Sequence, residues 1–143
     1  MRLVAGLSAQ TLWARDKASL DLGKPVLELG PGRAKLAMTL TERMVNGHGL
    51  GHGGFIFTLA DSALAVTCNS YGYRCVAPPG SVTFVTPARR CARLLAEATQ
   101  RHRAARSGIY DGTVREEAGD RRVQGALTHA SRQPARKLAV AGA

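Results

Sequence analysis

The hydrophobic positions in the first half of this 143-residue chain predict a helix, a hairpin and a second, buried helix. Residues 8–22 are interpreted as a first helix, with Ser8 as its N-cap. Residues 24–42 are interpreted as a hairpin, because apolar residues precede a Gly-Pro-Gly turn and then alternate with polar or small ones. After a loop to about residue 52, residues 53–70 are apolar around most of a helical circumference, which predicts a buried helix.

A succession of strand-like segments follows this helix, at 73–77, 81–86, 92–101, 107–115 and 121–128. Strands in direct succession indicate an antiparallel sheet rather than a parallel βαβ sheet. A helix with so little polar surface must be covered, and one curved sheet wrapped around it is the simplest cover. We therefore predict a single α+β domain over residues 1–130. Residues 131–143 are expected to form a basic, disordered tail.

Charge and composition narrow the class of partner. The formal net charge is +10, and 13 of the 20 lysines and arginines follow Asp61, which favours an anionic ligand. Only 5% of the residues are aromatic and the arginines are scattered, so no nucleic-acid partner is predicted. No apolar stretch approaches the roughly 18 residues of a membrane span, so no membrane partner is predicted. The apolar run before Asp16 is too short for a signal peptide, and we expect a cytoplasmic protein.

The segment GLGHGG formally matches the dinucleotide pattern G-x-G-x-x-G through Gly49, Gly51 and Gly54. That fold also needs a parallel βαβ unit and an acidic residue about 20 positions later, and the sequence offers neither. His48 and His52 precede the helix and have no third ligand nearby, so no metal is predicted. The three cysteines match no CxxC spacing and are expected to be reduced thiols.

The start of the predicted helix suits a different chemistry. Gly53 and Gly54 place backbone N–H groups without partners at the positive end of a helix dipole. A carbonyl oxygen, or the oxyanion formed from it, fits there; close backbone packing is the alternative reason for the glycines. Asp61 lies on the same helix face as Gly54. Because an unpaired buried charge is costly, Asp61 is either catalytic or satisfied by neighbouring hydroxyl or backbone groups.

Helix geometry separates these groups within one chain. At a rise of about 1.5 Å per residue, Gly54 and Asp61 are about 10 Å apart along the axis. That distance is too great for both to serve one carbonyl and its attacking water. Two antiparallel copies of the helix would bring the start of each to the aspartate of the other. The spacing therefore predicts a two-fold dimer with two composite sites.

The segment NGHGLGHGGFIFTLADSALAVTCNSYG, Asn46 to Gly72, resembles a family pattern without a gap. The pattern is N-G-H-x-x-x-H-G-G-x-x-x-x-L-A-D-x-A-x-x-x-x-C-N-S, of the phenylacetate-degradation (PaaI) subfamily of hotdog-fold acyl-CoA thioesterases. Weaker similarity through FVTPA and RSGIYD extends the resemblance over much of the chain. It implies the hotdog fold, a homodimer that usually assembles into a homotetramer, and hydrolysis of phenylacetyl-CoA or hydroxyphenylacetyl-CoA type thioesters. It implies no metal and no cofactor, since coenzyme A is part of the substrate.

The resemblance also implies roles for individual residues. Asp61 would be the catalytic carboxylate, acting as a general base or as a nucleophile. Gly53 would polarise the thioester carbonyl through its backbone N–H, and Asn46 would help to bind that carbonyl across the dimer interface. The substrate-binding residues would be His52, which shapes the loop, with Gly54, Ser62, Arg106, Ser107 and Gly108.

Three segments depart from the family pattern. Pro78 and Pro79 interrupt an expected strand, which indicates a bent or edge strand. The segment PARRCARLL lacks the usual Gly-Asp turn, and the end of the chain lacks the alternation and the aromatic residue of the family's last strand.

Two other functions are left open by the sequence. One is a hotdog module that binds acyl-CoA without cleaving it, although a pure binder would not need the carboxylate of Asp61. The other is a nucleic-acid-binding domain driven by the positive charge, which would leave the glycines and Asp61 unexplained.

Overall fold

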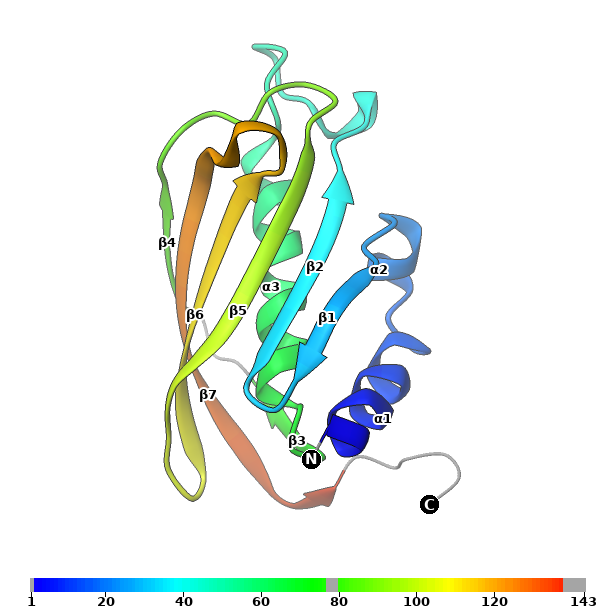
Figure 1. Cartoon of the computed structure of the whole chain (residues 1–143), viewed down its shortest axis with the longest axis vertical. Helices are drawn as coiled ribbons and strands as arrows, with labels where there is room; N and C mark the ends of the chain where they lie inside the picture. Colours follow the sequence, from blue (N-terminus) through cyan, green and yellow to red (C-terminus); the bar gives the residue numbers. More distant parts are fainter. Residues whose placement is uncertain (1, 77–79, 138–143) are drawn as a thin grey trace.

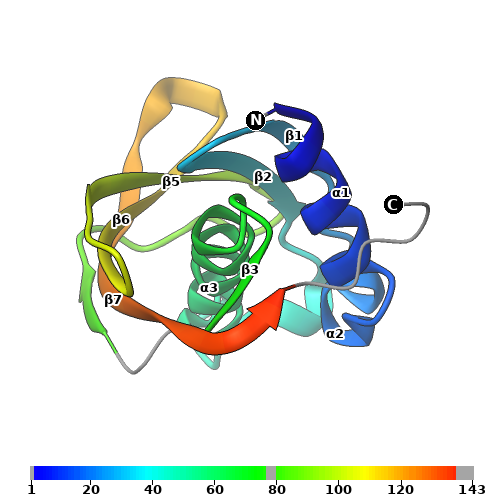
Figure 2. The same cartoon turned by 90° about the horizontal axis from the view of Figure 1, so that it is seen from below.

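The computed structural model describes residues 2–76 and 80–137. A curved antiparallel sheet wraps around one long helix, α3, and two short N-terminal helices pack at the open side (Figures 1 and 2). This confirms the α+β architecture predicted from the hydrophobic pattern. The elements are α1 (Arg2–Trp13), α2 (Lys17–Asp21), β1 (Val26–Gly30), β2 (Arg33–Thr39), η1 (Glu42–Met44), α3 (Gly53–Cys68), β3 (Tyr73–Val76), β4 (Ser81–Phe84), β5 (Arg93–Arg103), β6 (Ser107–Glu116), η2 (Ala118–Asp120) and β7 (Arg122–Lys137).

The described strands form a seven-stranded sheet in the order β1-β2-β5-β6-β7-β3, with β4 also paired to β7. Every pairing is antiparallel, as the succession of strands predicts. The β1–β2 hairpin turns at Gly32, whose φ of 72° is in the left-handed region that glycine adopts without strain. Viewed along α3, the sheet curls around the helix from β1 and β2 on one side to the end of β7 on the opposite side (Figure 2), and β3 pairs with β7 there.

The N-terminal segment differs from the prediction. Instead of one helix over 8–22, α1 begins at Arg2 and α2 begins after a break at Ala14–Asp16. Ser8 is not an N-cap, since it lies inside α1 and is buried. The break occurs because the Asp16 carboxylate accepts a hydrogen bond from the Ser19 backbone N–H and caps a new helix.

The helix α3 carries the core of the molecule. Its buried side chains include Ile56, Leu59, Ala63 and Leu64, and they pack against the concave face of the sheet. The helix ends at Cys68, and the Asn69 side chain holds the exit: its amide donates to the Ala65 carbonyl, and its Oδ1 accepts from the Cys75 backbone N–H. This fixes β3 against the C-terminal end of α3.

The last strand is much longer than predicted. β7 extends through Lys137, so residues 131–137 belong to the sheet, and the expectation that they form a disordered tail is wrong. The sheet stabilises this segment because its backbone pairs with β3, which the sequence alone did not indicate. Residues 138–143, and Pro78 and Pro79, lie outside the described residues.

Among residues 2–76 and 80–137, no helix is long and apolar enough to cross a membrane.

Candidate functional site

One stripe of α3 is not covered by the sheet. Gly54, Phe57 and Asp61 are exposed, and Thr58 and Ala65 beside them are half-buried. Gly54 and Asp61 therefore share a face, as predicted. The expectation that Asp61 is a buried acid is wrong for the single chain, because the sheet encloses α3 on its other sides only.

The two glycines at the start of α3 differ in their hydrogen bonding. His52 is the N-cap, and its Nδ1 accepts a hydrogen bond of 3.0 Å from the Gly54 backbone N–H. This bond requires the neutral imidazole with its proton on Nε2. Within the described part of the chain, no group accepts from the Gly53 N–H. Gly53 is thus the helix-terminal donor left open for a ligand, and Gly54 is not.

The loop before α3 is held by Asn46. Its side-chain Oδ1 accepts from the backbone N–H groups of His48 at 2.9 Å and Leu50 at 3.2 Å. Gly51 then passes so close to Leu40, just after β2, and to Ala88, between β4 and β5, that an added Cβ would lie 2.7 Å from Leu40 Cδ1. These contacts fix the path by which the chain enters α3.

A cavity of about 340 Å³ opens beside the start of the helix. Asn46, Gly53 and Ile56 line one part of it, and the segment 84–88 lines another. A Cβ added at Gly53 would lie 3.0 Å from the tip of the Phe84 ring, so the exposed Phe84 side chain lies directly against the start of the helix. The structure thus brings two predicted residues, Asn46 and Gly53, to one mostly apolar cavity.

Ser62 does not belong to the exposed stripe. It is buried, and its hydroxyl lies 3.1 Å from the Ser19 hydroxyl and accepts a hydrogen bond of 2.7 Å from Lys24 Nζ. The Ser19 hydroxyl in turn donates to the Asp16 carboxylate at 2.5 Å. A polar network therefore lies next to Asp61 in the fold. We call it the Lys24 network; its members are Asp16, Ser19, Lys24 and Ser62.

Sequence reasoning missed Lys24. It lies between α2 and β1 and is 2% exposed, although lysine is rarely buried. Its partner Ser62 is 38 positions away in the chain, so no local pattern indicates the contact. The one available signal was Gly23-Lys24-Pro25, a turn that could direct a side chain inward.

The Lys24 network and Asp61 influence one another electrostatically. Although the Asp61 side chain is exposed, the surrounding protein desolvates part of it and so raises the pKa of Asp61; the Lys24 ammonium opposes that rise and the Asp16 carboxylate adds to it. Burial lowers the pKa of Lys24 against the opposing effect of Asp16 and Asp61. The pKa of Asp16 is lowered, because its hydrogen bonds to Ser19 and the charge of Lys24 together outweigh its desolvation.

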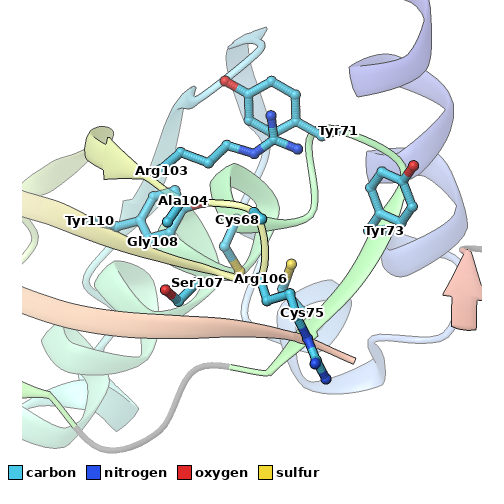
Figure 3. A pocket seen from close by; sticks show the side chains of 11 residues that line it. Cys68, Tyr71, Tyr73, Cys75, Arg103, Ala104, Arg106, Ser107, Gly108 and Tyr110 are labelled. Carbon is cyan, nitrogen blue, oxygen red and sulfur yellow. The ribbon is translucent and has the colours of Figure 1, made fainter. Parts of the chain in front are cut away.

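The remaining predicted residues lie at the other end of α3. Arg106 lies in the turn between β5 and β6, and Ser107 and Gly108 begin β6; with Cys68 and Tyr71 they line a narrow pocket (Figure 3). In the same pocket the Arg103 guanidinium lies 3.8 Å from the centroid of the Tyr71 ring. Within one chain the length of α3 separates this pocket from Gly53 (Figure 1).

Comparison with known proteins gives the family. The model of the Thioesterase superfamily matches residues 48–122. The acyl-coenzyme A thioesterase PaaI of Escherichia coli is 36% identical over 104 residues, covering 73% of this chain and 74% of the relative. A putative esterase of Deinococcus radiodurans is 42% identical over 78 residues, covering 54% of this chain and 53% of the relative.

Solved structures agree with this result. The structure of E. coli PaaI superposes with a TM-score of 0.89 at 31% identity, covering 92% of this chain and 95% of that one. The TT0310 protein of Thermus thermophilus has a TM-score of 0.78 at 33% identity, covering 83% of this chain and 99% of that one. The curved sheet around α3 is therefore the hotdog fold.

Proposed function

Because the chain belongs to the thioesterase superfamily, we propose that it hydrolyses acyl-coenzyme A thioesters, with phenylacetyl- or hydroxyphenylacetyl-coenzyme A as the substrate type. One observation carries this proposal: a single helix offers both a Gly53 backbone N–H without an acceptor among the described residues and an exposed carboxylate, Asp61. The similarity to E. coli PaaI supports the choice of substrate class.

The chemistry assigns one task to each group. The Gly53 N–H donates to the thioester carbonyl oxygen and stabilises the negative charge that develops there. Asp61 removes a proton from water as the water oxygen bonds to the carbonyl carbon. The C–S bond then breaks, and the coenzyme A sulfur takes the proton from Asp61. If Asp61 instead attacks the carbonyl carbon, coenzyme A leaves as the thiol and a mixed anhydride forms; attack of oxygen-18 water on the aspartyl carbon of this anhydride leaves the isotope in the Asp61 carboxylate.

The proposed site is composite. Gly53 and Asp61 of one chain are eight residues apart, or about 12 Å along the helix axis, which is too far to serve one carbonyl. A two-fold dimer that packs the exposed stripes of α3 against each other would place Gly53 of one protomer opposite Asp61 of the partner subunit. The same dimer would bury the exposed stripe of α3.

The cavity at the start of α3 is proposed to hold the acyl group. It adjoins Gly53, and its wall includes the side chains of Ile56, Phe84 and Val85. Asn46 also lines it; its Oδ1 already accepts two loop N–H groups, which leaves its amide group to donate to the substrate. Arg106 and its neighbours at the β5–β6 turn are proposed to meet the anionic coenzyme A portion.

The direct test is Asp61→Asn in an assay of coenzyme A release from phenylacetyl-coenzyme A. We expect kcat/KM to fall by at least about 10²-fold, because a general base is lost while the side-chain shape is kept. The matched control is Asp120→Asn, an exposed aspartate with a φ of 51°, a conformation that asparagine tolerates. Wild-type activity in a folded Asp61→Asn protein would refute the assignment.

A further inference from the structure

Lys24 is a buried cation next to the proposed site. It is 2% exposed and lies in the turn between α2 and β1, where Gly23 has a φ of 63°. Removing an ammonium group from water is costly unless other groups compensate the charge. The Lys24 ammonium therefore needs compensating groups, and these come from α3 and from the start of α2.

The ammonium is fixed against one turn of α3. Lys24 Nζ donates to Ser62 Oγ at 2.7 Å and to the Thr58 carbonyl oxygen at 3.3 Å. Thr58 and Ser62 are four residues apart, and Asp61 lies between them in the sequence. The positive charge is thus anchored beside the helical turn that carries Asp61.

The carboxylates near Lys24 carry more negative charge than its single ammonium group can neutralise. Among the described residues, the groups that interact electrostatically with the Asp61 carboxylate are Lys24 from the turn before β1, Asp16 from the start of α2, and Cys68 further along α3. Lys24 in turn interacts with both Asp16 and Asp61. Two carboxylates, Asp16 and Asp61, therefore share one ammonium, and these three groups together carry a net negative charge when all of them are ionised.

We propose that Lys24 is a positioning residue for the hydrolysis: its ammonium, anchored by Ser62 and Thr58, keeps the neighbouring Asp61 in the carboxylate form that accepts the proton from water. Asp16 acts in the opposite sense. Its negative charge disfavours the ionised form of Asp61, and its hydrogen bonds to Ser19 fix the far end of the Lys24 network.

This inference rests on the proposed function, and its sign follows from electrostatics. A general base is active when ionised, so kcat/KM rises with pH through the pKa of Asp61. Loss of the Lys24 charge removes a stabilising neighbour of the carboxylate and moves this rise to higher pH. Loss of the Asp16 charge removes a destabilising neighbour and moves it to lower pH.

The experiment compares the pH profiles of kcat/KM for phenylacetyl-coenzyme A in wild type, Lys24→Met and Asp16→Asn. Methionine keeps the length of the side chain without the charge, and asparagine is itself a good N-cap for α2. The matched control is Lys17→Met, which removes the same charge from an exposed position in α2. Lys24→Gln, which keeps a hydrogen-bond donor, repeats the test if Lys24→Met does not fold.

We expect kcat/KM of the Lys24 variants to fall at least about threefold further than that of Lys17→Met on the acidic side, and to recover as the pH rises. Asp16→Asn is expected to shift the profile to lower pH. A purely structural role for Lys24 would lower kcat/KM equally at every pH. An acidic limb that does not move in the Lys24 variants would overturn the proposal.

A second measurement separates this inference from the proposed function. Carbon-13 NMR of labelled aspartate follows the Asp61 carboxyl directly, with Asp61→Asn identifying its signal. The titration midpoint is expected to rise in the Lys24 variants and to fall in Asp16→Asn, whether or not any thioester is cleaved. Absence of hydrolysis by wild type with these shifts present would refute the proposed function alone, and unchanged midpoints would refute the role of Lys24.

Discussion

Gly53 and Gly54 are neighbours with different chemical roles. The Gly54 N–H is used by the N-cap His52, and the open donor at the helix start is Gly53. A ligand has little room to approach the Gly53 N–H, because the ring of Phe84 would lie 3.0 Å from a Cβ at Gly53. A backbone donor of this kind cannot be removed by truncating a side chain, but it can be removed by proline.

Gly53→Pro is expected to lower kcat by about 10²-fold, because it deletes the proposed oxyanion donor. Proline is tolerated at the first position of a helix, and the ψ of 128° at His52 suits a residue that precedes proline. The measurement is kcat for phenylacetyl-coenzyme A, with the helix content of each variant checked by circular dichroism.

Gly53→Ala is the matched control for this variant. It adds the same Cβ against Phe84 but keeps the N–H, and Phe84 is 55% exposed and free to move aside. Its kcat is expected to stay within about threefold of wild type. Equal losses in the alanine and proline variants would mean that steric contact, and not the hydrogen bond, decides the rate.

At the scale of elements, the apolar run and the glycines predicted α3 almost to its ends, and strand-like segments predicted the sheet. The single N-terminal helix was wrong because Asp16 caps a second helix, a local competition that helical periodicity does not reveal. The length of β7 was missed because its pairing with β3 is formed between distant segments.

The site was only partly predictable for the same reason. Asp61, Gly53 and Asn46, whose functional roles are proposals, belong to one continuous motif, so the sequence alone could single them out. Lys24 contacts Ser62 from a distant part of the chain. Only the structure shows that the Ser62 hydroxyl is buried and accepts a hydrogen bond from Lys24.

Another element held by charge is the loop that connects β4 to β5. The Glu116 carboxylate, 1% exposed at the end of β6, accepts from the backbone N–H and guanidinium of Arg89 and from Arg121. Desolvation opposes ionisation, but these hydrogen bonds outweigh it and lower the pKa of Glu116 from 4.5 to about 2. The loop turns at Cys91, whose φ is 62°, where the family pattern has a Gly-Asp turn.

The stability of the protein should therefore depend on pH through Glu116. A lowered carboxyl pKa stabilises the fold fully above pH 4.5, and this contribution is lost as the pH falls towards about 2. Glu116→Gln is expected to reduce the free energy of unfolding at neutral pH by about 2 kcal/mol, after allowance for solvent screening at the exposed arginines. Urea unfolding at several pH values measures this.

The neighbouring Glu117→Gln is the control, since Glu117 pairs with Arg93 at the surface. Surface pairs contribute little, so its unfolding curve should nearly match that of wild type. If Glu116→Gln and wild type lose stability in parallel between pH 4.5 and 2, Glu116 does not carry this pH dependence.

At the scale of the whole molecule, the uncovered side of α3 is the feature that matters most. Phe57 on α3, Phe84 at the end of β4 and Val85 directly after it are exposed in the single chain. Asp61 lies on this open side, and Gly53 begins the same helix about 12 Å away along the axis, too far for the two to act on one carbonyl. The proposed dimer accounts for the exposed apolar side chains and for the distance between Gly53 and Asp61, because it covers the apolar surface and completes two sites.

Subunit mixing tests this central claim most directly. Gly53→Pro and Asp61→Asn chains are each assayed alone and then after co-refolding in equal amounts. In a mixed dimer, one site combines the intact Gly53 of the Asp61→Asn chain with the intact Asp61 of the Gly53→Pro chain. Random pairing then predicts recovery of about a quarter of the wild-type hydrolysis rate. A mixture no more active than the separate variants, with mixed dimers shown by mass spectrometry, would contradict the composite site.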